Sequence, residues 1–131
     1  MWRKAIVLDD DRFDCERIRD FLSNQNMDAE VVMNQAKLEN ALQWWHPDVL
    51  VVNPLVRFMD VPAFLGRFRE QEGRVPVVLA GAMAEKTLEK WARSFECEAS
   101  FSTLDGSNKL MARLREVYDQ INFSEDSGVG W

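Results

Sequence analysis

The chain has 131 residues, of which 47% are hydrophobic and 29% charged, and its formal net charge is −6 at pH 7. This composition is typical of an ordinary soluble globular domain, and its negative charge argues against direct nucleic-acid binding. No signal peptide and no run of about 20 apolar residues is present, so we expect neither secretion nor a membrane span. The two cysteines, Cys15 and Cys97, lie far apart without a CxxC motif. We therefore expect a cytoplasmic protein without a metal site.

Two hydrophobic periodicities alternate along the chain. Short β-rich runs predict five strands at residues 4–8, 29–33, 48–52, 75–80 and 99–102. After each run, apolar residues recur at helical spacing, which predicts five helices that each pack by one face. The predicted faces are Cys15, Ile18, Phe21 and Leu22; Leu38, Ala41, Leu42 and Trp45; Phe64, Leu65 and Phe68; Leu88, Trp91, Ala92 and Phe95; and Leu110, Leu114, Val117 and Ile121.

Strands that alternate with helices predict an α/β fold, in which helices cover both faces of a parallel sheet. The domain is predicted to span residues 1–121. The last ten residues, NFSEDSGVGW, carry no apolar period. They are either a flexible tail or the start of a linker to a further domain.

Polar residues end two of the predicted strands. The first strand runs into Asp9, Asp10 and Asp11, and the third ends at Asn53. Because the carboxyl ends of parallel strands meet at one edge of the sheet, we expect these side chains to lie together. A carboxylate at position 53 would complete a pocket for Mg²⁺ and a phosphoryl group. The amide of Asn53 is neither a good nucleophile nor a charged ligand.

Three segments, taken in order, resemble the receiver domain of bacterial two-component response regulators. They are KAIVLDDDRFDCERIRDFL, HPDVLVVNPLVRFMDVPAFLGRFRE and GRVPVVLAGA, and the resemblance covers residues 3–121. The resemblance implies a flavodoxin-like (βα)5 three-layer sandwich with a parallel five-stranded sheet in the order 2-1-3-4-5.

The same resemblance implies which residues stand at the family's functional positions. In the family, an aspartate on the third strand accepts the phosphoryl group and two acidic residues hold Mg²⁺ with it. Here Asp9 and Asp10 keep the acidic pair, whereas Asn53 stands at the acceptor position. The family's hydroxyl, aromatic switch residue and lysine correspond to Gly81, Ser100 and Thr103. We therefore expect a pseudo-receiver that is no enzyme, needs no cofactor and binds Mg²⁺ at most weakly and without function.

The expected function is phosphorylation-independent regulation of an attached or separate output, such as transcription, through protein–protein interaction or dimerisation. In the family, the face of the fourth helix, fifth strand and fifth helix often dimerises. By resemblance, that face would contain Lys90, Arg93, Ser100, Ser102, Arg113 and Tyr118. The alternative is a sensor that holds a nucleotide or metabolite in the former phosphorylation pocket. A missing Gly-rich phosphate loop and the acidic pair count against this alternative.

Some of these residues also have purely structural interpretations. The amide of Asn53 is expected to close a polar network around Asp10. Trp45 and Trp91 are predicted core residues, whereas Trp44 is predicted to be half-exposed. The two cysteines are expected to be small buried hydrophobes.

Overall fold

The computed structural model describes residues 4–24, 26–71 and 75–104, together with Ala112, Arg115, Glu116 and Asp119. Apart from these last four residues, the predicted fifth helix lies outside the described part of the chain. The predicted tail at 122–131 also lies outside it. None of the helices in the described residues has the length and hydropathy that crossing a membrane requires.

Strands and helices alternate along the chain, as predicted. The elements are β1 (Lys4–Leu8), α1 (Arg12–Asn24), β2 (Asp28–Val32), α2 (Gln35–Trp44), β3 (Val49–Val52), α3 (Val61–Gln71), β4 (Val77–Gly81), α4 (Glu85–Ser94) and β5 (Ala99–Ser102). All strand pairs are parallel, and the sheet has the order β2-β1-β3-β4-β5. This order confirms the predicted flavodoxin-like topology.

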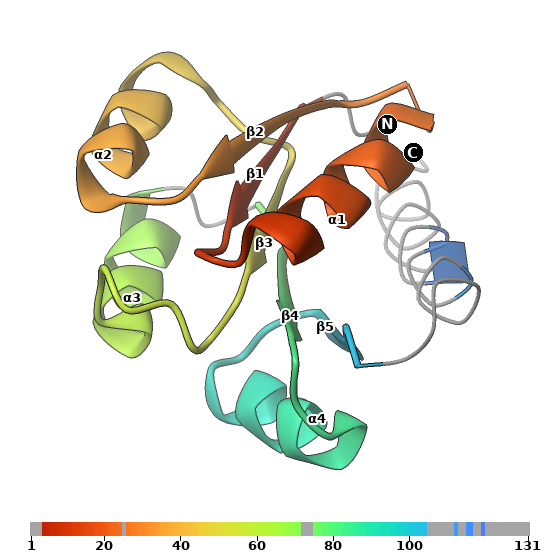
Figure 1. The fold of residues 1–131 in the computed structure, drawn as a ribbon. Helices are drawn as coiled ribbons and strands as arrows, with labels where there is room; N and C mark the ends of the chain where they lie inside the picture. Colours follow the sequence, from red (N-terminus) through yellow and green to blue (C-terminus); the bar gives the residue numbers. More distant parts are fainter. Residues whose placement is uncertain are drawn as a thin grey trace, which may run out of the picture.

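The sheet separates two hydrophobic cores, because successive strand side chains point to opposite faces. On β1, Ala5 and Val7 join one core with the apolar face of α1. Ile6 and Leu8 join the other core with side chains of α2, α3 and α4. Figure 1 shows α1 on one side of the sheet and α2 and α3 on the opposite side. Both faces of the central strands are therefore buried, which accounts for their continuous apolar sequences.

Backbone and side-chain caps set the ends of several helices. The Asp11 side chain accepts the Asp14 N–H at 3.1 Å at the start of α1, and Asn34 accepts the Lys37 N–H at 2.9 Å at the start of α2. Past the ends of α1 and α4, Asn26 and Glu96 adopt positive φ angles of 61° and 57°. Such left-handed residues turn the chain out of a helix and back towards the sheet.

The bounds of β1 and β5 are as predicted, whereas those of β2, β3 and β4 differ from the prediction by one or two residues. β4 was predicted from position 75 but begins at Val77, because Pro76 has no N–H to donate to a strand ladder. β2 lies one residue earlier than predicted. Asp48 lies just before β3, where its side chain accepts the Lys4 N–H at 2.9 Å.

The tryptophans only partly follow the prediction. Trp45 and Trp91 pack against the core but are only half-buried, so their prediction as core residues is confirmed in part. The Lys4 ammonium lies 5.5 Å from the ring centroid of Trp45. Trp44 is more exposed than expected, at 71%. Of the two cysteines, Cys15 is fully buried as predicted and Cys97 is half-buried.

Candidate functional site

The carboxyl ends of four strands place the predicted site residues at one edge of the sheet. Asp9 follows β1, Asn53 follows β3, Gly81 ends β4 and Thr103 follows β5. Backbone bonds hold this edge in register, since Asn53 donates to the Leu8 carbonyl at 2.9 Å and Thr103 donates to the Gly81 carbonyl at 2.8 Å. The sequence therefore predicted correctly that Asp9 and Asn53 meet.

The carboxamide of Asn53 is hydrogen-bonded at both ends. Its Nδ2 donates to Asp9 Oδ1 at 3.0 Å, and its Oδ1 accepts the Leu55 N–H at 2.8 Å. The second bond forms a turn in which an Asn side chain binds the backbone two residues on. The Leu55 N–H can bond only to the oxygen of the Asn53 amide, so this turn leaves the NH₂ end of the amide to face Asp9. Asn53 is 7% exposed, so the amide is held inside the protein.

Asp9 is a buried carboxylate with two N–H donors. Its Oδ1 accepts the Asn53 amide and the Asp11 N–H at 2.9 Å, and the residue is 1% exposed. Burial, which disfavours the charged form, raises the pKa of Asp9 to about 6, although the two hydrogen bonds act in the opposite direction. At neutral pH this side chain is therefore mostly ionised and is the acceptor in the cluster.

The raised pKa of Asp9 predicts a pH dependence of stability. Since this pKa rises from 3.8 to about 6 on folding, the folded chain holds the proton more tightly than the unfolded chain. The contribution of Asp9 to the free energy of unfolding should be full below pH 3.8 and decline as pH rises through 6. Urea unfolding across this range should show the wild type losing stability relative to Asp9→Asn. Parallel curves for the two proteins would contradict the prediction.

Asp10 belongs to the protein surface rather than to this cluster. Its Oδ2 accepts the Arg57 N–H at 3.2 Å and lies 3.9 Å from Arg57 Nε. The Arg57 side chain is 93% exposed, so the ion pair adds little to stability. The expectation that Asn53 closes a network around Asp10 was therefore wrong, because Asn53 binds Asp9 instead.

Gly81 lies directly against the Asn53 amide. A Cβ added at Gly81 would lie 3.1 Å from Asn53 Oδ1 and 3.5 Å from Pro54 Cδ. Glycine at this position leaves room for the amide. A larger residue would have to displace a side chain that two hydrogen bonds hold in place.

We predict opposite effects for two glycine-to-alanine changes. Gly81→Ala should lower the free energy of unfolding by about 1 kcal/mol, because the new methyl group crowds Asn53 Oδ1. Gly66→Ala, inside α3 with nothing within 4 Å of the added Cβ, should raise it by about 1 kcal/mol through helix propensity. Urea denaturation of both variants checks the pair. A stabilised Gly81→Ala would show that Asn53 shifts freely.

A second buried carboxylate, Asp14 of α1, was missed by the sequence analysis. Its Oδ2 accepts the Thr103 hydroxyl at 2.8 Å, and both residues are less than 10% exposed. Burial raises the pKa of Asp14, against the effect of this hydrogen bond. A sequence signal exists, because Asp14 precedes Ile18 by four residues and so falls on the apolar face of α1. Thr103, which the resemblance places at the lysine position of receiver domains, is therefore bound to a carboxylate.

The proposed interaction face is only partly exposed. Ser100 and Ser102 were predicted to lie on it, but they are 5% and 6% exposed, so this assignment was wrong. α4 packs against β5, and the Ser102 hydroxyl donates to the Met83 carbonyl at 2.6 Å. Lys90 and Arg93 of α4 are exposed. The remaining two members of the face, Arg113 and Tyr118, lie outside the described residues.

Neither thiol is suited to nucleophilic chemistry. Burial raises the pKa of Cys15 to about 12, and the surrounding carboxylates reinforce the shift. Burial likewise raises the pKa of Cys97 to about 11, although Arg69 opposes the shift. The thiolate is the reactive form, so both groups are protonated and inert at neutral pH.

The geometry around Asp9 matches Mg²⁺ poorly. Mg²⁺ is bound through oxygen atoms in near-octahedral geometry. Asn53 turns an N–H donor towards Asp9, while its oxygen is occupied by Leu55. Within the described part of the chain, no three His, Cys, Asp or Glu side chains are grouped so as to hold a metal ion.

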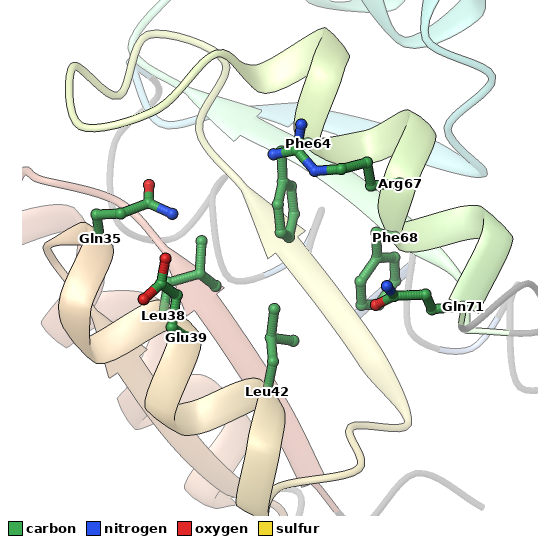
Figure 2. Close-up of a pocket in the computed structure, with 8 residues that line it drawn as sticks. All are labelled: Gln35, Leu38, Glu39, Leu42, Phe64, Arg67, Phe68 and Gln71. Carbon is green, nitrogen blue, oxygen red and sulfur yellow. The ribbon is translucent and has the colours of Figure 1, made fainter.

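Three cavities lie away from this edge. The first, of about 170 Å³, lies between α2 and α3, where Leu38, Leu42 and Phe64 point towards one another beneath a polar rim that includes Arg67 (Figure 2). The second, also about 170 Å³, lies between α3 and the end of α4. The third, of about 260 Å³, lies between α1 and β2. None of the three is lined by Asn53, so the alternative of a ligand sensor at the Asn53 edge stays a prediction.

No family model matches this sequence, and no curated protein does. Among solved structures, the chain is similar to the signal receiver domain of a DNA-binding response regulator from Colwellia psychrerythraea 34H. The TM-score is 0.71 at 16% identity, over 89% of this chain and 98% of that chain. It is also similar to the chemotaxis response regulator CheY4 of Vibrio cholerae, with a TM-score of 0.72 at 13% identity, over 89% and 99% of the two chains.

A third similar structure is NtrX from Brucella abortus, with a TM-score of 0.77 at 12% identity. The match covers 95% of this chain and 29% of NtrX. At these identities the likeness establishes the fold alone. The chain therefore has the receiver-domain fold that its sequence resembles.

Proposed function

We propose, from the receiver fold of this chain, that it is a two-component signalling domain that works through protein contacts and without phosphoryl transfer. In this proposal the domain is a pseudo-receiver, catalyses no reaction and uses neither Mg²⁺ nor another cofactor. It regulates an attached or separate output, for which transcription is one candidate.

The observation that carries this proposal is that both ends of the Asn53 carboxamide are hydrogen-bonded within the protein. An acyl phosphate forms on a carboxylate, and the neutral amide at position 53 is a poor nucleophile. The amide is also bound at both ends, to Asp9 and to Leu55. Gly81 supplies no hydroxyl and Thr103 no cation, and the hydroxyl of Thr103 is bound to Asp14. These bonds support the proposal, because Asn53 and Thr103 are bonded to other groups of the protein rather than free for a phosphoryl group.

The similar structures support a role in regulating an output. The chain matches 54% of DrrB, an OmpR/PhoB homologue of Thermotoga maritima, and 29% of NtrX, so in both proteins the matching region belongs to a longer chain. We propose that the present domain likewise acts on a further domain or a separate protein.

Beryllofluoride tests the independence from phosphorylation. A receiver domain of DrrB has been solved in a form described as BeF3-activated, and it serves as the positive control. We expect Mg²⁺ with beryllofluoride to leave the amide NMR spectrum and solution mass of this chain unchanged while the DrrB receiver responds. Acetyl phosphate with Mg²⁺ should leave its intact mass unchanged. A saturable response at residues 9 and 53, or a covalent adduct, would refute the proposal.

Solution mass tests the interaction face. If the chain self-associates through α4, light scattering at rising concentration should show a dimer that Lys90→Glu with Arg93→Glu weakens. The matched control is Arg67→Glu, a charge reversal at an exposed position on α3, which should leave the dimer unchanged. A dimer that survives the α4 reversals would exclude this face as the interface.

A further inference from the structure

We propose that the cavity between α1 and β2 binds a small phosphomonoester with a short apolar body. This site is separate from the Asn53 edge and does not rest on the proposed function. The cavity measures about 260 Å³ and is lined by α1, by the end of β2 and by the first turn of α2. Its volume is below the range of about 300–1,000 Å³ for drug-sized ligands, which favours a small metabolite.

The rim of this cavity is cationic in a protein of net charge −6. Arg12 and Arg19 lie seven residues apart on α1, so two helical turns bring both to the same face. Lys37 of α2 adds a third cation, and Glu16 is the one carboxylate of the lining. The rim therefore carries an excess of two positive charges, which matches the charge of a phosphomonoester at neutral pH.

These cations are available for a ligand. Within the described residues, the side chains of Arg12, Arg19 and Lys37 form no ion pair. The arginine that does form one, with Asp10, is Arg57, which does not line this cavity. All three residues are exposed. A guanidinium presents two parallel N–H donors that fit the oxygens of a phosphate. The same fork also fits a carboxylate, but the excess of two positive charges on the rim favours a phosphate dianion over a singly charged carboxylate.

The inner wall of the cavity is apolar. Val31 of β2 and Met33, just after β2, are half-buried and line it together with Cys15 of α1. An apolar body on the ligand would cover Val31 and Met33 while its phosphate reaches the basic rim. Inorganic phosphate uses only the rim, and a neutral apolar compound uses only the wall, so a ligand with both parts should bind more tightly than either.

Cys15 joins this cavity to the acidic cluster. Its thiol donates to the Asp9 backbone carbonyl at 3.4 Å, and the residue is 1% exposed. Only the Cys15 side chain therefore separates a ligand on this wall from Asp9, which binds the Asn53 amide. Binding should consequently also shift the NMR signal of the Asn53 side-chain amide by a small amount.

Phenyl phosphate is the probe, because it combines a dianion with an apolar ring. Titrated into the full ¹⁵N-labelled chain, it should give saturable amide shifts at residues 12–19 and 31–37, with a dissociation constant below about 1 mM. Inorganic phosphate and benzyl alcohol should each bind more weakly. Arg19→Gln and Lys37→Gln should each weaken binding about tenfold, the loss expected for one charge-assisted hydrogen bond.

Lys86→Gln is the matched control, since Lys86 is an exposed cation of α4 outside the cavity. This variant should bind phenyl phosphate as the wild type does. Unchanged affinity in both cavity variants would overturn the proposal, and so would shifts that are unsaturable or spread over all basic residues. A phosphorylated peptide that bound the same amides more tightly than phenyl phosphate would overturn the small-molecule assignment in favour of a protein partner.

Discussion

Replacing Asn53 with aspartate is expected to lower the free energy of unfolding at pH 7 by about 3 kcal/mol, measured by urea denaturation without divalent cations. The change removes the Nδ2 donor that lies 3.0 Å from Asp9 Oδ1 and places a second carboxylate there. Both positions are less than 10% exposed, so water screens the repulsion poorly. The Leu55 N–H bond can survive, because it ends on an oxygen in either residue.

The loss should shrink as the pH falls from 7 to 5. Two carboxylates in contact raise the pKa of one of them, and a shared proton then restores a donor. Asn34→Asp is the matched control, because Asn34 caps α2 through its oxygen and aspartate caps equally well. That variant should be as stable as the wild type. An Asn53→Asp protein with wild-type stability at pH 7 would show that the edge tolerates two charges.

Replacing Phe101 with alanine is expected to have the largest effect, a loss of about 4 kcal/mol in the free energy of unfolding. Phe101 is 1% exposed and packs in the core between the sheet and α1. By resemblance to receiver domains, the position of their aromatic switch residue is occupied here by Ser100, one residue before Phe101. Phe101 is thus a fixed core residue rather than a side chain that can turn between an exposed and a buried position.

Phe13 offers the comparison for this variant. It is 67% exposed on α1, with the Arg17 guanidinium 5.3 Å from its ring centroid. Phe13→Ala should change the free energy of unfolding by less than about 1 kcal/mol, because it leaves no cavity and loses one exposed cation–π contact. Thermal and urea unfolding of the two variants give the difference directly. Similar losses at both positions would contradict the assignment of Phe101 to the core.

The fold was largely predictable because its signals are periodic. Continuous apolar strands and one-sided helices fix the element types, and short crossovers then fix a parallel sheet. The strand ends were less predictable, since they depend on local chemistry such as the missing N–H of Pro76. Burial at the end of α2 was also less predictable, because Trp45 follows the apolar period but is the C-cap residue, and it packs against the core only in part.

The candidate site was predictable only in part, because Asp14 was missed and Asp10 lies outside the cluster. Topology alone placed Asp9 beside Asn53, whereas the bond from Thr103 to Asp14 joins residues 89 apart in the sequence. Ser102 was misplaced for a related reason. A serine on an edge strand suggests exposure, but Ser102 is buried and its hydroxyl donates a hydrogen bond to the Met83 carbonyl in the loop before α4. Polarity predicts exposure only where no other element packs over the residue.

Pro54, which lies beside Gly81 and directly follows Asn53, has a chemical consequence for the Asn53 amide. Asparagine side chains age to aspartate mainly through a cyclic imide, which forms when the backbone nitrogen of the next residue attacks the amide carbon after losing its proton. The residue that follows Asn53 is a proline, whose nitrogen carries no proton. The cyclic-imide route of deamidation is therefore closed at position 53. The neutral amide that binds Asp9 is thus protected from the main chemical route by which asparagine becomes aspartate.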